Sequence, residues 1–257
     1  MNPVRPIGRA FLGFLEATGR LGSFCFHGLT HSVRPPFYFR LLGRQCLDIG
    51  YYSLPVVGLT TLFSGMVLAL QSYTGFARFS AEGAVATVVV LSMTRELGPV
   101  LAGLMVAGRV GAAMAAELGT MRVTEQIDAL ETLSTNPYKY LVAPRLIAGL
   151  AMLPLLVLVG DIIGVFGGYL VGVYKLGFNP ASYLKNTLDF LEFIDVFSGL
   201  VKASVFGFII ALMGCYNGYY SRGGAQGVGA ATTNAVVSAS ILILTSNYMI
   251  TELFFGT

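Results

Sequence analysis

Long apolar stretches alternate with short polar ones along the chain, and their lengths predict helices that cross a membrane. Five stretches qualify: Ile49–Leu70, Ala84–Gly108, Leu141–Tyr174, Val196–Tyr219 and Val228–Phe255. A bilayer-spanning helix needs roughly 20 residues. Prolines interrupt several stretches, but inside a membrane neighbouring helices can satisfy the backbone groups that a proline frees. The pattern predicts an all-α integral membrane protein with five transmembrane helices.

The segment before the first span has a different pattern. In Ile7–Leu29 the polar residues Arg9, Glu16, Arg20, Ser23 and His27 share one helical face, opposite Ile7, Phe11, Phe14, Leu21 and Cys25. Residues 1–44 are therefore expected to form an N-terminal segment with an amphipathic helix in the membrane interface, ahead of a transmembrane domain at residues 45–257. An ordinary surface helix packed on protein is the alternative.

Two connections between spans also have helical periodicity. Asn179–Asp195 predicts a short amphipathic helix with Tyr183, Leu184, Leu188, Leu191 and Ile194 on one side. Gly119–Asn136 contains an apolar ridge of Val123, Ile127 and Leu130 beside the acidic residues Glu125, Asp128 and Glu131. This second segment is too short and too acidic to span, and an acidic helix with an apolar ridge is suited to binding a partner protein.

Composition supports the membrane assignment. The 257 residues are 55% hydrophobic and 11% charged, and the mean hydropathy is +0.72. Soluble domains carry roughly 25% charged residues, so this chain cannot cover a surface in water. The three cysteines are widely spaced and match no disulfide or zinc pattern, and no basic surface for nucleic acid is present.

The positive charges indicate the orientation. With the N-terminus in the cytoplasm, the opposite side holds only Arg78, Lys175 and Lys185. The cytoplasmic side then holds Arg5, Arg9, Arg20, Arg34, Arg40, Arg44, Arg122, Lys139, Arg145 and Arg222. Positive residues accumulate on the cytoplasmic side of membrane proteins, so the N-terminus is expected inside and the C-terminus outside.

Charged residues inside the spans are candidates for function because they are costly in lipid. They are Arg95 and Glu96 in the second span, Asp161 in the third and Lys202 in the fourth. They could pair with one another and stabilise the helix bundle. The alternative is that they form a relay for protons or ions. Arg95 and Glu96 are consecutive, so their side chains diverge by about 100°. We expect Glu96 to pair with Lys202 and Arg95 to remain for a lipid headgroup.

The third span carries a ridge of glycines at Gly160, Gly164, Gly168 and Gly172. Glycines four residues apart share one helical face, and a second backbone can approach such a face closely. A helix-packing role is expected.

Sequence signatures of catalysis are absent. The chain has no GxSxG, HExxH or GxxxxGK[ST] motif and no clustered metal ligands. We expect no catalytic residue, metal or cofactor in this chain, and energy for any driven transport must come from elsewhere.

Several motifs together resemble the MlaE (YrbE-type) permease family over roughly residues 45–255. They are Thr94-Arg95-Glu96-Leu97-Gly98-Pro99-Val100, Ala107-Gly108-Arg109-Val110-Gly111, the segment from Ala116 to Leu130, Asn217-Gly218-Tyr219, and Gly227 to Val237. The family provides the membrane subunit of ABC transporters that maintain lipid asymmetry of the bacterial outer membrane.

The resemblance implies a set of partners. They are a second copy of the chain, a cytoplasmic ABC ATPase dimer that binds the ATP, a periplasmic hexamer of MCE-domain subunits, often a STAS-domain protein, and phospholipid as substrate. It also implies a location in the bacterial inner membrane.

The resemblance further assigns roles to residues of this chain. Thr120–Leu133 would be the coupling helix that docks on the ATPase, through Glu117, Val123, Thr124, Glu125, Ile127, Asp128, Leu130 and Glu131. Arg95, Glu96 and Lys202 match polar positions near a lipid cavity, whose lining would include Leu68, Phe76, Phe79 and Leu97. Gly75 departs from the family pattern, which often has a larger apolar residue there.

Three alternatives remain. An importer of the same fold could carry a sterol or organic solvent. An intramembrane enzyme would need a nucleophile or metal set that the sequence lacks. An ion-coupled secondary transporter would normally show inverted repeats, which are not seen.

Overall fold

All regular structure in the described part of the chain is helical. The computed structural model describes residues 4–35, 38–79 and 81–256, with the side chains of residues 4–11, 14, 33, 79 and 82 outside that description. Five helical runs within it are long and apolar enough to cross a membrane: Phe39–Phe76, Val85–Val123, Tyr138–Lys175, Phe193–Tyr219 and Gly224–Phe255. The predicted all-α, five-span architecture is confirmed.

The first three runs are assembled from several helices. The first contains α2 (Phe39–Ile49), η1 (Tyr51–Ser53) and α3 (Leu54–Phe76). The second contains α4 (Val85–Ser92), η4 (Met93–Leu97), α5 (Gly98–Val106), η5 (Ala107–Gly111) and α6 (Ala112–Val123). The third contains η6 (Tyr138–Val142), α8 (Ala143–Leu170) and η7 (Val171–Lys175).

The fourth and fifth spans are the single helices α10 (Phe193–Tyr219) and α11 (Gly224–Phe255). The remaining elements are α1 (Val4–Val33), η2 (Ala77–Phe79), η3 (Glu82–Ala84), α7 (Gln126–Thr132) and α9 (Pro180–Asp189). The turns η4, η5, η6 and η7 are π-helical. Each adds a residue to a turn and rotates the next helical segment, and such turns are common at functional sites.

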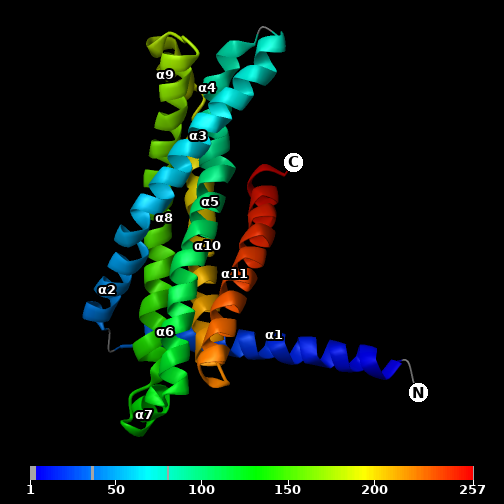
Figure 1. Ribbon diagram of the computed structural model, residues 1–257, viewed down its shortest axis with the longest axis vertical. Coiled ribbons are helices and arrows are strands. Elements are labelled where there is room, and N and C mark those ends of the chain that lie inside the picture. The colour runs from blue at the N-terminus through cyan, green and yellow to red at the C-terminus, as the bar shows by residue number, and fades with distance from the viewer. Residues whose placement is uncertain (1–3, 36–37, 80, 257) are drawn as a thin grey trace.

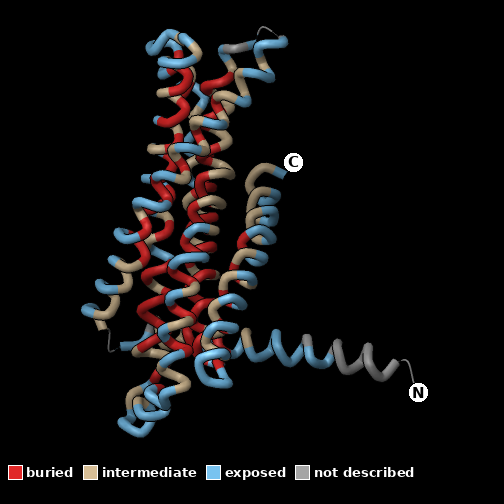
Figure 2. The backbone as a smooth tube through the Cα atoms, viewed as in Figure 1, coloured by how far each residue is buried: buried red, intermediate tan, exposed pale blue. Residues whose placement is uncertain are grey.

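Helices of unequal reach give the bundle its shape. In Figure 1, α3, α4, α8 and α9 extend to one end, whereas α11 stops well short of it. α7 lies at the opposite end, and α1 runs across the foot of the bundle. Burial concentrates where the spans meet, while most described residues of α1 are exposed (Figure 2).

α1 runs across the bundle rather than along it (Figure 1), and its placement in a membrane interface stays a prediction. Ser23 and His27 of the predicted polar face are exposed, and Leu21 and Cys25 of the apolar face are partly buried. Phe24 is the buried anchor, in ring contact with Tyr138, Tyr216 and Tyr219. Of the remaining predicted face residues, the side chains of Ile7, Arg9, Phe11 and Phe14 lie outside the described residues.

The connection between the third and fourth spans differs from the prediction of one helix over Asn179–Asp195. The Asn179 side chain caps α9 by accepting from the backbone N–H of Ala181 at 2.9 Å. α9 ends at Asp189, and α10 starts at Phe193 with Glu192 as its N-cap. Ile194 and Asp195 therefore belong to the fourth span, because a capping box between Glu192 and Asp195 starts a new helix there.

The glycines of the predicted ridge, three on α8 and Gly172 on η7, are buried and pack against elements of the same chain. Gly160 faces Val57 and Thr61 of α3, Gly164 faces Met93 and α3, and Gly168 and Gly172 face Tyr183 of α9. Gly65 of α3 approaches so closely that a Cβ there would collide with the Gly164 carbonyl. The absence of side chains on both helices permits this contact.

We predict that Gly65→Ala destabilises the protein, by about 1–3 kcal/mol, because the added methyl group must push two backbones apart. Gly75→Ala, on the same helix, is the matched control, since no atom lies within 4 Å of a Cβ there. It should be neutral or slightly stabilising, because alanine favours helix over glycine. Thermal unfolding in detergent measures both variants, and equal midpoints would contradict the close-packing explanation.

Candidate functional site

A polar site forms where the backbone hydrogen bonding of the second span is interrupted. Pro99 has no N–H, so the carbonyl oxygen of Arg95 lacks the donor that an α-helix would supply from four residues further on. The π-helical turn η4 covers this position, and the Gly98 N–H bonds to the Met93 carbonyl instead. The Nζ of Lys202 on α10 donates to the Arg95 carbonyl at 2.7 Å.

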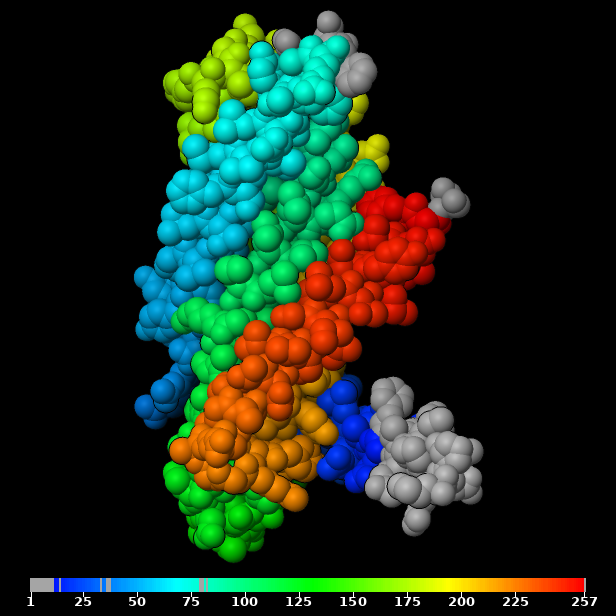
Figure 3. Space-filling view, turned by 45° about the vertical axis from the view of Figure 1, so that its right-hand side comes forward, coloured from blue at the N-terminus to red at the C-terminus, as the bar shows by residue number. Residues whose placement is uncertain are grey.

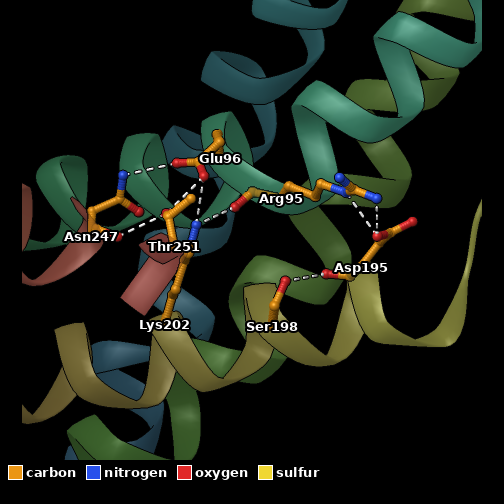
Figure 4. Close-up of polar contacts among 7 residues, drawn as sticks. All are labelled: Arg95, Glu96, Asp195, Ser198, Lys202, Asn247 and Thr251. Carbon is orange, nitrogen blue, oxygen red and sulfur yellow. Dashed lines mark hydrogen bonds and ion pairs between the residues drawn. The ribbon is translucent and has the colours of Figure 1, made fainter. Parts of the chain in front are cut away.

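Glu96 completes the environment of Lys202 and joins three helical elements. Lys202 Nζ lies 2.8 Å from Glu96 Oε1. From α11, Asn247 Nδ2 donates to Glu96 Oε2 at 2.8 Å and Thr251 Oγ1 lies 2.9 Å from Oε1. Figure 4 shows these side chains converging from η4, α10 and α11. The predicted pairing of Glu96 with Lys202 is present in the structure.

Arg95 points away from Glu96 and has its own partner. Its Nε and Nη2 each lie 2.7 Å from Asp195 Oδ1, and its guanidinium carbon lies 4.4 Å from the Phe255 ring centroid. Asp195 Oδ2 accepts from the Glu192 N–H at 3.0 Å. The expectation that Arg95 is left without a protein partner is wrong, because Asp195 lies on the first turn of α10, within reach of η4 (Figure 4).

The resulting charge network, formed by Arg95, Glu96, Asp195 and Lys202, is neutral and half open. Lys202 and Asp195 are fully buried, whereas the side chains of Glu96 and Arg95 are 39% and 34% exposed. Gly199 allows α10 to pack closely against η4, because a Cβ at position 199 would collide with the Thr94 carbonyl. The buried members are fully paired, and the accessible members present one positive and one negative group at the surface.

The other predicted intramembrane charge lies apart from this network. Asp161 on α8 is buried, and its Oδ1 makes no hydrogen bond within the described part of the chain. It occupies the space where Gly98 would carry a Cβ, and it lines an apolar cavity.

Three of the predicted lipid-cavity residues are brought together. Leu68 and Phe76 of α3 and Leu97 of η4 pack around one apolar cluster and remain partly exposed. The cluster consists of Ala69, Val85, Val89, Met93 and Val171. The side chain of Phe79 lies outside the described residues. A cavity between two subunits, to which the resemblance assigns these residues, stays a prediction for this single chain.

The predicted coupling helix Thr120–Leu133 is two helices. α6 ends at Val123, and Glu125 adopts a left-handed backbone conformation with φ of 59° before α7 begins at Gln126. Thr124 occupies the break and is exposed. The helical periodicity across residues 123–130 does not place Val123 on the same ridge as Ile127 and Leu130, because the chain turns between them.

α7 packs through its apolar residues on its own chain. Ile127 is fully buried and Leu130 is half-buried against the main core. The acidic residues Glu125, Asp128 and Glu131 are exposed, with Asp128 Oδ1 2.6 Å from Arg122 Nη1. Ile127 and Leu130 therefore cannot form the expected apolar ridge for a partner, whereas Leu133, directly after α7, is 74% exposed.

Glu117, the remaining predicted coupling residue, lies on α6 and forms an ion pair within the chain. Its Oε2 lies 2.8 Å from Nη2 of Arg145 at the start of α8. Arg145 is buried, and its Nη1 also donates to the Leu141 carbonyl at 2.8 Å. This pair fixes the end of the second span against the third, close to α7.

The structure thus combines five helical spans with a paired charge network and an exposed acidic helix at one end. The family model described as "Permease MlaE" matches residues 42–253. The chain belongs to the MlaE permease family and is a permease of an ABC transporter.

Relatives from distant bacteria agree. A "Probable ABC transporter permease protein" of Rickettsia bellii is 65% identical over 99% of this chain and 98% of its own length. The "Intermembrane phospholipid transport system permease protein MlaE" of Haemophilus influenzae is 36% identical over 100% of this chain and 98% of its own length. A "Probable ABC transporter permease protein" of Synechocystis is 44% identical over 82% of this chain and 81% of its own.

The sequence interpretation missed three residues of the site. Asp195 was assigned to the connecting helix, although Glu192 and Asp195 stand at capping-box spacing and could have indicated a helix start. Asn247 and Thr251 are four residues apart in an apolar span, which places them on one face. The sequence alone does not show that this face binds Glu96 on the neighbouring span.

We predict a strong coupling between Glu96 and Lys202 in a double-mutant cycle. Lys202→Met and Glu96→Gln should each destabilise the protein by about 1–3 kcal/mol, because each leaves a buried or half-buried polar group short of a partner. The double variant should cost less than the sum.

Glu16 and Arg20 provide the control cycle, since this pair at 3.9 Å is well exposed. Exposed pairs of this kind couple by less than about 1 kcal/mol. Thermal unfolding in detergent is the measurement for both cycles. Additive effects at Glu96 and Lys202 would show that the contact contributes nothing to stability.

Proposed function

We propose that this chain is the membrane permease of a transporter that moves phospholipid between the inner membrane and periplasmic lipid-binding subunits, and so maintains outer-membrane lipid asymmetry. The main observation in support is the charge network at the end of α11, in which Arg95 and Glu96 are partly exposed beside an apolar surface. The name of the Haemophilus influenzae relative, an intermembrane phospholipid transport permease, supports the same substrate.

The proposal includes a defined assembly. Two copies of the chain enclose the lipid cavity, because one five-span bundle does not surround a lipid. An ATPase dimer binds and hydrolyses ATP on the cytoplasmic side, and the excess of lysines and arginines favours the N-terminus on that side as well. On the periplasmic side an MCE-domain hexamer receives or delivers lipid, and a STAS-domain protein accompanies the ATPase.

Arg95 is the proposed headgroup contact. Its bonds to Asp195 use Nε and Nη2, which leaves Nη1 for a phosphate oxygen. Guanidinium binds phosphate well and stays charged at any relevant pH. Leu68, Phe76 and Leu97 border the apolar cluster between α3 and η4, and they would contact the acyl chains.

The proposed ATPase contact is the exposed side of α7. Glu125, Asp128 and Glu131 supply negative charge there, and Leu133 supplies an exposed apolar side chain. Because α7 follows α6 in the same chain segment as η4, a displacement of α7 acts on the helical run that carries Arg95 and Glu96. A sterol or organic solvent remains the alternative substrate, and it would not require the phosphate contact.

We predict that Arg95→Lys lowers the phospholipid that co-purifies with the complex severalfold while the bundle stays folded. Lysine still offers a cation to Asp195 but loses the planar fork. Arg109→Lys is the control, because Arg109 contacts Asp48 and Ser53 and lies in η5, away from the charge network on the same helical run. Lipid phosphorus per protein is the readout. An unchanged value for Arg95→Lys would argue against the headgroup role and favour a substrate without phosphate.

We also predict that Leu133→Asp combined with Asp128→Lys abolishes co-purification of the ATPase without unfolding the spans, because both side chains are exposed. Ile127→Asp is the contrasting variant and should unfold the cytoplasmic end, since Ile127 is fully buried. Lys185→Asp on α9 controls for a charge change at the opposite end. Retained ATPase binding and lipid-stimulated hydrolysis in the double variant would place the docking surface elsewhere.

A further inference from the structure

A cavity separate from the charge network opens on the opposite side of η4. It has a volume of about 560 Å³ and is lined by α4, η4, α8, α9, the α9–α10 connection and the start of α10. The wall is apolar, with Ile162, Phe166 and Leu188 each more than half exposed at its rim. In a membrane protein such a rim faces lipid or a partner.

Two polar side chains without partners lie in this apolar wall. Asp161 is 6% and Tyr183 is 4% exposed, and neither Asp161 Oδ1 nor the Tyr183 hydroxyl forms a hydrogen bond within the described part of the chain. These are two of the five buried polar atoms in that condition among the described residues. The cavity's hydroxyls Thr94 and Thr187, by contrast, donate to carbonyls of their own helices at 2.9 Å.

The geometry indicates which atom an occupant can reach. Asp161 Oδ1 is sealed against Gly98, so only the second carboxyl oxygen is available to a molecule in the cavity. The Tyr183 hydroxyl lies over Gly168, two helical turns or roughly 10 Å along α8 from Asp161. Burial raises the pKa of Tyr183 to about 12, so its hydroxyl remains a donor.

Size and charge restrict the occupant. Small-molecule sites measure about 300–1,000 Å³, and this cavity falls in that range. No cation lines the cavity among the described residues, and burying an ammonium group in this apolar wall would require its desolvation. A neutral hydroxyl donor avoids that cost.

We propose that this cavity binds the hydrocarbon chain of a single-chain lipid that carries a free hydroxyl group, with the hydroxyl donating to the carboxyl group of Asp161. The apolar wall buries the chain, and the hydrogen bond gives the buried carboxyl group of Asp161 a partner through its second oxygen. The site lies on the other side of η4 from the charge network and does not depend on the proposed transport function.

The chain contains no tryptophan, so a single introduced tryptophan reports on one place. Phe166→Trp puts the fluorophore at the cavity rim, and Phe63→Trp on α3 is the control at an exposed apolar position that does not line the cavity. Both full-length proteins are reconstituted in phosphatidylcholine vesicles. The probes are dibrominated octadecanol, which quenches tryptophan on contact, and its methyl ether, which lacks the hydroxyl donor.

We expect the alcohol to quench the Phe166→Trp protein with saturation at a concentration about tenfold lower than the ether requires, as the loss of one buried hydrogen bond predicts. The Phe63→Trp protein should respond weakly and equally to both probes. In the Phe166→Trp background, Asp161→Leu should remove the preference for the alcohol, whereas Asp161→Asn, which keeps an acceptor, should retain most of it.

Three results would overturn the proposal. Equal quenching of the Phe166→Trp and Phe63→Trp proteins would mean contact with bulk lipid only. Equal responses to alcohol and ether, measured with Asp161 present and therefore independent of any folding defect in the variants, would exclude the hydroxyl contact. Loss of quenching in the Phe166→Trp protein on assembly with the ATPase and periplasmic subunits would assign the cavity to a partner helix.

Discussion

The ammonium group of Lys202 is the constraint around which the rest of the site is organised. It is fully buried among apolar helices, and a buried cation must be paired and hydrogen-bonded. The required acceptors come from Glu96 and from the Arg95 carbonyl. That carbonyl is available because Pro99 cannot donate to it. Pro99 therefore interrupts the hydrogen bonding of the second span and leaves a carbonyl free to accept from Lys202 on the fourth. The π-helical turn η4 lies at this interruption.

The network also determines how α11 is held. α11 is the least buried of the five spans, and its far end bonds to Glu96 through Asn247 and Thr251. Phe255 adds a contact with the Arg95 guanidinium. Figure 3 shows α11 crossing obliquely over the green helices of the second span, with cyan α3 uncovered beyond its end. The end of α11 is therefore attached by polar contacts at the edge of an open apolar surface.

Hydropathy was sufficient to predict the five spans, because the bilayer requires long apolar helices with internal hydrogen bonds. Charge cost and helical geometry were sufficient to predict the Glu96–Lys202 pair. Two features could not be predicted from the hydrophobic and charge pattern of the sequence. The turn at Glu125 occurs without glycine, asparagine or proline, so no local signal breaks the periodicity there. Periodicity likewise showed that Ile127 and Leu130 share a face, but not that their own bundle would bury that face.

The packing of the bundle separates a close-packed part from a part held by polar contacts. α8 meets α3 through Gly65 and Gly164, and it meets α10 through Gly149 and Gly207, at distances that admit no added Cβ. Such interdigitated contacts resist sliding, because any shift produces collisions or voids. Hydrogen bonds from Asn247 and Thr251 to a half-exposed carboxylate can instead be exchanged for bonds to water or a headgroup. Relative motion in this bundle is therefore easiest between α11 and η4, where Arg95 and Glu96 are accessible, and hardest along the glycine ridge of α8.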